Sequence, residues 1–205
     1  MALTDDSKRV MTLTGQGHVF AVPDTAVIRL GVQTTGENLA LIQSENARKI
    51  QGVIQVLKQL GVTDIKTFQY TIDKNYEYEN GKQIDKGYTV RNIIEIRTNN
   101  LQGVGNIIDS AVNAGSNAVE LISFDVSNQD YYYKHALNLA VMNAVDKAKS
   151  ISMNLGIKAD LIPIHIAENS SLAVPMQQFQ REYAKTPILP GNIKIEAMIT
   201  ADFEY

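Results

Sequence analysis

The end of the chain constrains its fold more than any other segment. From Ile193 to Tyr205, apolar side chains occupy every odd position, and polar side chains stand between them except at Met198. Over such a length, a period of two can bury one face and expose the other only if the segment is a strand. The segment therefore predicts a sheet, and it offers no catalytic motif.

Three other segments carry apolar residues at helical spacing, and they predict helices over about 39–60, 101–112 and 130–155. Asparagines before the first two can cap them, and a glycine can end each of the three: Asn38, Asn99 or Asn100, and then Gly61, Gly115 and Gly156. The third helix has an alanine at every fourth position, namely Ala136, Ala140, Ala144 and Ala148. A ridge of small side chains lets a helix lie close to a sheet.

Alternating segments predict strands at about 10–16, 25–35, 67–78, 84–98, 118–127, 161–168 and 193–204. Asn80-Gly81 offers a tight turn for a hairpin. From residue 25 to 127 the order is strand, helix, strand, strand, helix, strand, which is a ferredoxin-like βαββαβ unit. The predicted class is α+β, with mostly antiparallel sheets and helices on one face.

The predicted organisation is a polar lead-in at 1–9 and one domain over 10–205. That domain can be divided into two subdomains, one of residues 25–127 and one of residues 10–24 plus 128–205. The long irregular stretch at 169–192 holds three of the five prolines. Loops of that length are uncommon inside a compact domain and are often functional.

Composition excludes several functional classes. The 205 residues contain no cysteine, so disulfides and thiolate metal sites are excluded. The net charge of −3 gives no electrostatic reason to expect a nucleic-acid partner. No apolar run is long enough for a transmembrane helix, and the first nine residues lack the apolar stretch of a signal peptide. Either the protein is cytoplasmic or this is a mature, trimmed form.

Two glycine motifs resemble functional signatures but fail in detail. Gly15-Gln16-Gly17 begins like a dinucleotide fingerprint, yet Phe20 stands where the third glycine belongs, so a turn between two strands is the better interpretation. Lys86-Gly87-Tyr88 resembles part of an RNA-recognition signature, but the stacking aromatics are missing. We therefore expect Tyr88 to be a core or edge aromatic.

No catalytic, cofactor-binding or metal-binding residue is predicted. His18, His135 and His165 are expected on a loop, a helix start and a strand, and none has a second ligand three or four residues away. Asp73 and Glu77 are expected to be solvated strand charges. Asn92 is expected to tie a neighbouring backbone segment, because an amide buried without partners would be costly.

Two groups of residues are predicted contacts for other chains. One is the apolar part of the 169–192 loop, represented by Val174, Met176 and Phe179. The other is Tyr131-Tyr132-Tyr133 at the start of the third helix. These tyrosines could also stack on a ligand, but a subunit or subdomain contact is favoured, because amphipathic aromatics anchor interfaces well.

Several segments together resemble one family. They are Thr12-Leu13-Thr14-Gly15-Gln16-Gly17, then 23–32, Gly87-Tyr88-Thr89-Val90-Arg91-Asn92, 104–115, and the closing pattern P-G-x-I-x-I-x-A. This combination resembles the SIMPL-domain family, which includes bacterial periplasmic immunogenic proteins, and the resemblance covers about residues 10–205. Each piece is weak alone.

The resemblance implies a non-enzymatic, extracytoplasmic protein whose relatives assemble into ring- or channel-like oligomers and are associated with envelope or oxidative stress. It implies no catalytic residues. The leading hypothesis is therefore a homo-oligomeric envelope scaffold that associates through strand edges and the 169–192 loop. The alternative is a module that binds a peptide or small ligand. A hydrolase ranks third, because no catalytic constellation is present.

Overall fold

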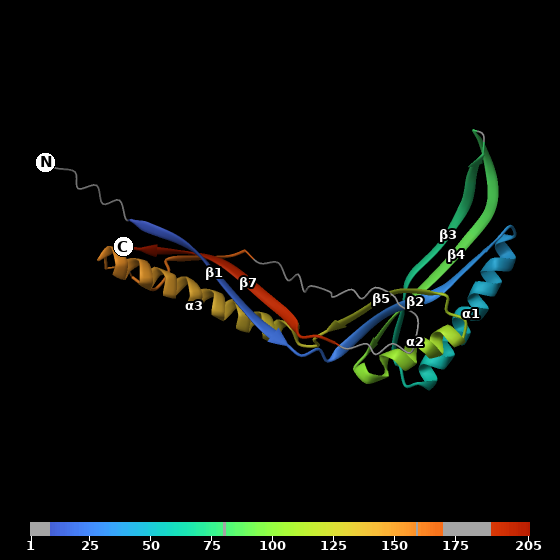
Figure 1. Ribbon diagram of the computed structural model, residues 1–205, viewed down its shortest axis with the longest axis horizontal. Helices are drawn as coiled ribbons and strands as arrows, with labels where there is room; N and C mark the ends of the chain where they lie inside the picture. Colours follow the sequence, from blue (N-terminus) through green and yellow to red (C-terminus); the bar gives the residue numbers. More distant parts are fainter. Residues whose placement is uncertain (1–8, 80, 159, 170–189) are drawn as a thin grey trace. The chain divides into compact units, whose positions relative to one another are not determined.

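The computed structural model describes residues 9–79, 81–158, 160–169 and 190–205, and these form two compact units (Figure 1). We call them the three-stranded unit, which is built on residues 9–22, 126–169 and 192–205, and the four-stranded unit, which is built on residues 23–125. Each unit has its own sheet and its own hydrophobic core.

The four-stranded unit has the predicted ferredoxin-like order of elements. They are β2 (Thr25–Gly36), α1 (Leu39–Gln59), β3 (Asp64–Glu79), β4 (Lys82–Thr98), a 3₁₀ turn (Leu101–Gly103), α2 (Val104–Asn113) and β5 (Ala118–Asp125). The strands lie in the order β3-β4-β2-β5, and each neighbouring pair is antiparallel. This confirms the α+β class predicted from the sequence.

Helices α1 and α2 of this unit pack their large aliphatic side chains on one face of the sheet. The core combines the even residues of β2 with Ile50, Val53 and Leu57 of α1 and Val104 and Ile107 of α2. The predicted caps are present: the Asn38 side chain accepts a hydrogen bond from the Leu41 amide, and the Asn100 side chain accepts one from the Gly103 amide. Asn100 thus caps the 3₁₀ turn that precedes α2, and not α2 itself.

The three-stranded unit consists of β1 (Val10–Ala21), α3 (Gln129–Leu155), β6 (His165–Glu168) and β7 (Ile193–Glu204). Its strands lie in the order β1-β7-β6, and both pairs are antiparallel. The odd residues of β7 are buried, as the period of two predicts. The alanine ridge of α3 is fully buried in the same core, so the predicted close approach of helix and sheet is confirmed.

The prediction of a turn at Gly15-Gln16-Gly17 is wrong, because these residues lie in the middle of β1. A Cβ atom on Gly15 would lie 2.0 Å from the carbonyl oxygen of Ala140, and one on Gly17 would lie 2.1 Å from that of Ala136. The glycines are therefore needed where the strand touches α3, and not for a turn. His18, which was expected on a loop, also lies in β1.

The role expected of Asn92 belongs to a different asparagine. Asn92 is only half-buried, and its side chain has no hydrogen bond to any described residue. In contrast, Asn46 of α1 is 1% exposed, and its Nδ2 donates to the carbonyl oxygens of Val32 at 2.9 Å and Val90 at 3.2 Å. Asn46 thus ties α1 to the backbones of β2 and β4.

Candidate functional site

The hairpin of β3 and β4 continues past the end of its sheet (Figure 1). The last pair that β2 forms with β4 joins Gly36 to Tyr88, whereas β3 and β4 remain paired as far as Glu79 and Lys82. We call residues 74–79 and 81–88 the arm. Its strands pair only with each other beyond Tyr88, and an isolated two-stranded ribbon is marginally stable in water. The arm is therefore the part of this sheet with the greatest need for further contacts.

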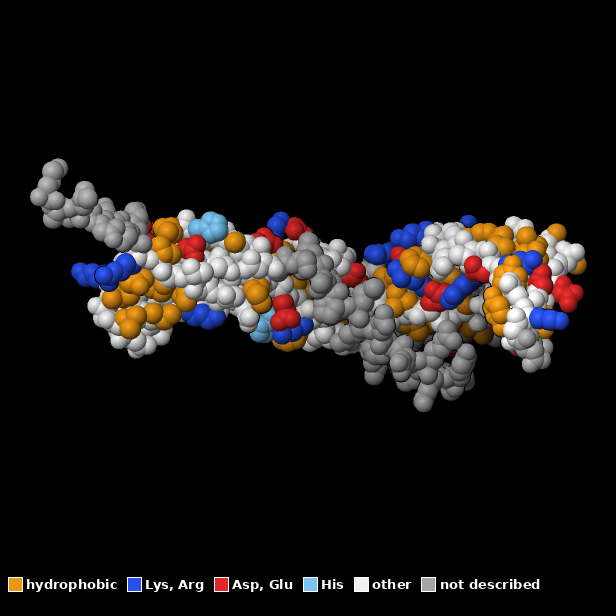
Figure 2. Space-filling view, turned by 90° about the horizontal axis from the view of Figure 1, so that it is seen from above, with side chains coloured by type: hydrophobic (Ala, Val, Ile, Leu, Met, Phe, Trp, Pro, Cys, Tyr) orange, Lys and Arg blue, Asp and Glu red, His pale blue; other side chains and the backbone are white. Residues whose placement is uncertain are grey.

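One side of the hairpin carries exposed apolar side chains that run from the sheet into the arm. Tyr70, Ile72, Tyr76 and Tyr78 are 46%, 40%, 49% and 72% exposed, and we call them the aromatic face. They lie at even positions of β3 with Lys74 between them, and the extra residue of the bulge opposite Lys74 and Tyr76 lies in β4. Figure 2 shows hydrophobic side chains at the surface of the four-stranded unit, beside charged ones.

Lys74 lies between Ile72 and Tyr76 on β3 and contacts aromatic rings of both strands of the hairpin. Its Nζ lies 5.4 Å from the ring centroid of Tyr76 and 5.6 Å from that of Tyr88, so it makes cation–π contacts with both. The same Nζ lies 2.8 Å from Oδ2 of Asp85. These contacts place Lys74, Tyr76, Tyr88 and Asp85 on one side of the hairpin.

Four charged residues of the arm form two ion pairs. The hydrogen bond from Lys74, together with one from the Gly87 amide, lowers the pKa of Asp85, and the bond to Asp85 raises the pKa of Lys74. A second pair joins Lys86 to Glu77 at 2.7 Å. The four charges of these two pairs sum to zero. Neither pair therefore adds a net charge to the surface beside the aromatic face.

The outer edge of β3 is poorly suited to strand pairing. It carries Asp64, Lys66, Asp73 and Lys74, and its register shifts at two bulges. Charged residues and bulges are the usual means by which edge strands avoid edge-to-edge association. The face of the hairpin, and not its edge, is therefore the better surface for a partner.

The structure separates the three tyrosines predicted as contacts. Tyr131 is 53% exposed and makes edge-to-face contacts with Tyr132 and His135, at centroid distances of 5.3 and 4.6 Å. Tyr133 is 8% exposed, belongs to the core and donates its hydroxyl hydrogen to Glu168. Burial removes Tyr133 from the predicted surface contacts. Val174, Met176 and Phe179 lie outside the described residues.

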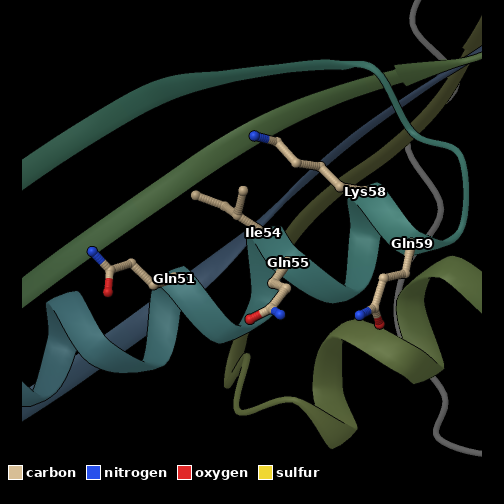
Figure 3. A pocket seen from close by; sticks show the side chains of 5 residues that line it. All are labelled: Gln51, Ile54, Gln55, Lys58 and Gln59. Atoms are coloured by element: carbon tan, nitrogen blue, oxygen red, sulfur yellow. The ribbon is translucent and has the colours of Figure 1, made fainter.

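The described residues contain no cluster of three or more His, Cys, Asp or Glu side chains that could hold a metal ion. A depression lies on the surface of α1 (Figure 3). All five residues that line it come from this one helix: Gln51, Ile54, Gln55, Lys58 and Gln59. Ligand sites usually combine groups from several elements, so the depression does not resemble a built site. No helix among the described residues is long and apolar enough to cross a membrane.

The aromatic face was missed by the sequence analysis, although its residues were assigned to the correct strand. The strand predicted at about 67–78 contains Tyr70, Ile72, Tyr76 and Tyr78 at even positions. This pattern did not show how much of this side α1 would cover: the Gln43 side chain of α1 donates a hydrogen bond to the Tyr70 hydroxyl, yet Tyr70 remains 46% exposed.

Comparison with known proteins identifies relatives of the chain. Residues 11–203 match the family described as SIMPL, protein of unknown function (DUF541). The uncharacterized protein YggE of Escherichia coli K12 is 27% identical over 149 residues, which cover 72% of this chain and 60% of YggE. The chain thus spans about three fifths of the length of that relative. The 26 kDa periplasmic immunogenic protein of Brucella melitensis is 27% identical over 210 residues, covering 95% of this chain and 84% of that protein.

Proposed function

Because the chain belongs to the SIMPL family, we propose that it is a non-enzymatic protein of the cell envelope that self-associates as a scaffold through the aromatic face of its β3–β4 hairpin. The name of the Brucella relative contains the word periplasmic, which supports an extracytoplasmic location. The absence of enzyme activity and a link to envelope or oxidative stress rest on the family resemblance alone.

The exposed aromatic face is the observation that carries this proposal. Tyrosine is enriched at interfaces, since one side chain supplies a large apolar ring and a polar hydroxyl. The four side chains expose on the order of 400 Å². The largest apolar patch of a typical monomer has a similar size, and such patches are often functional.

The size of the surface also limits the contact. Two aromatic faces that pack on each other would together bury on the order of 800 Å², which is below the standard size of specific protein interfaces. A second copy of this chain would therefore bind weakly through the arm alone. A stable assembly needs further contacts, for which exposed Tyr131 is a candidate among the described residues.

The proposal is tested by the solution mass of the chain, measured by light scattering after size exclusion. The wild-type chain should give a mass of several subunits of 22.7 kDa. Tyr76→Ser combined with Tyr78→Ser should reduce that mass, because the two most exposed rings of the arm are removed. Tyr205→Ser is the matched control, since Tyr205 is also an exposed tyrosine at a strand end but lies outside the arm.

Two results would contradict the proposal, and they differ. A wild-type monomer across a hundredfold range of concentration would reject self-association and favour the alternative of a module that binds a peptide or small ligand. A wild-type oligomer whose mass is unchanged by the two arm substitutions would leave self-association standing and reject the arm as its contact.

A further inference from the structure

Strand β1 is an edge strand with almost no sequence protection against pairing. It is 12 residues long, lies at one end of the order β1-β7-β6, and keeps an unbroken register with β7. Residues 10–21 contain no Lys, Arg, Asp, Glu or Pro. Long, flat and uncharged edges tend to pair with strands of other molecules. Another feature must therefore keep this edge closed.

Two side chains of α3 bond to backbone groups of β1. The Gln16 amide donates to Oδ1 of Asn143 at 3.1 Å, and Nζ of Lys147 donates to the carbonyl oxygen of Thr14 at 2.7 Å. The spacing of the four residues matches: four residues along a helix span about 6 Å, and two residues along a strand span about 6.6 Å. The two side chains of α3 and the two backbone groups of β1 are therefore separated by nearly the same distance.

The bonded groups belong to the open side of β1. In an antiparallel pair, alternate residues direct their N–H and C=O groups to the partner strand, and the residues between direct theirs away. The Tyr205 amide donates to the carbonyl oxygen of Arg9, so odd-numbered residues face β7. Thr14 and Gln16 have the other parity, and their groups would be the ones to receive an added strand.

The glycines of β1 make this contact possible. Since Gly15 and Gly17 have no side chain, the backbone of α3 comes close to the strand. At that separation the short side chain of Asn143 reaches the Gln16 amide. An ordinary residue at either glycine would move the helix away and leave the edge groups without these partners.

We propose that Asn143 and Lys147 close the open edge of β1 and so prevent it from pairing with a strand of a second copy. A strand that added there would need the Gln16 N–H and the Thr14 C=O, which α3 already occupies. This closure is independent of the arm. It directs self-association away from β1, whose long uncharged edge would otherwise compete with the arm for a second copy.

The first test is amide hydrogen exchange at Gln16 in the full chain. Asn143→Ala should speed exchange of this amide by about tenfold, the loss expected when a single hydrogen bond is removed. Lys147→Ala should affect it less, because Lys147 bonds to Thr14. Lys149→Ala is the control, since it removes the same charge from an exposed position of the same helix. Unchanged exchange in Asn143→Ala would overturn the proposal.

The second test is association of the double variant Asn143→Ala, Lys147→Ala, followed by light scattering and thioflavin fluorescence over time. We expect particles that grow with concentration, whereas the wild type and Lys149→Ala do not grow. Adding Gln16→Pro to the double variant should stop the growth, because proline has no N–H to offer on the open edge. If the particles of the double variant do not grow, Asn143 and Lys147 do not prevent pairing at the β1 edge. The same conclusion follows if Gln16→Pro leaves the growth unchanged.

Discussion

The two units join helices to sheets in opposite ways. In the four-stranded unit, α1 and α2 meet the sheet through large aliphatic side chains such as Val53 and Leu57. In the three-stranded unit, α3 meets β1 through alanines that face glycines. The second arrangement brings the helix close enough to bond with the edge of the sheet. The first leaves the sheet free to extend beyond its helices as the arm. The packing of each core thus determines which of its surfaces another molecule can reach.

Gly15→Val tests the close packing of α3 on β1 most directly. The added side chain would start from a Cβ only 2.0 Å from the Ala140 carbonyl oxygen, so α3 would have to move. We expect a loss of about 3 kcal/mol in the free energy of unfolding of the three-stranded unit. Denaturant titration followed by hydrogen exchange should show this loss in β1, β7 and α3 and not in α1.

Gly52→Ala is the control, since it also adds a Cβ at a glycine that faces another element. Its Cβ would lie 3.6 Å from the Ala114 carbonyl oxygen, which is an ordinary contact. Alanine favours a helix interior over glycine, so this variant should gain about 0.5–1 kcal/mol. If Gly15→Val were as harmless as Gly52→Ala, the close approach of α3 to β1 would be disproved.

Asn46→Ala tests the hydrogen bonds that join α1 to the sheet of the four-stranded unit. The variant leaves the carbonyl oxygens of Val32 and Val90 without their buried donor, and it should cost about 2 kcal/mol. Asn92→Ala serves as its control, because Asn92 is half-buried and should cost about 0.5 kcal/mol. Equal losses in chemical denaturation of the two variants would contradict the assignment of the tie to Asn46.

The smallest expected effect concerns pH. Burial raises the pKa of Glu95, but hydrogen bonds from Lys66 and Arg29 outweigh it and hold that pKa below its usual value. A carboxyl group whose pKa is lowered by folding stabilises the fold at neutral pH, and this contribution is lost as the pH falls through the lowered pKa.

The melting temperature of the wild type should therefore fall between about pH 5 and pH 3, and Glu95→Gln should fall less steeply over the same range. Glu120→Gln provides a control, because Glu120 pairs with Arg91 on the same sheet. If the melting temperatures of wild type and Glu95→Gln have the same pH dependence, Glu95 does not contribute to it.

Local pattern was enough to predict most of the elements. The alternation of Ile193 to Phe203, the caps at Asn38 and Asn100, and the glycines that end the helices all act between residues that are near in sequence. The order of elements from 25 to 127 then left the ferredoxin-like unit as the simplest arrangement, and the sheet order confirms it.

The features that matter for association depend on distant residues, and local pattern missed them. Gly15 and Gly17 looked like a turn because their partners, Ala136 and Ala140, lie more than a hundred positions away. The arm depends on the difference in length between β3–β4 and β2, and β2 pairs with a strand that is distant in the sequence. The role of Asn46 could not be predicted from local pattern either, since its two acceptors lie on other elements.

We infer that this chain associates through the arm and keeps the β1 edge closed. Amide hydrogen exchange of the wild-type chain, compared between dilute and concentrated solution, tests both halves in one experiment. We expect the amides of residues 74–79 and 81–88 to exchange more slowly as the concentration rises. The amides of Thr14 to His18 should exchange at the same rate in both solutions. Protection gained in β1, with the arm unchanged, would contradict this inference.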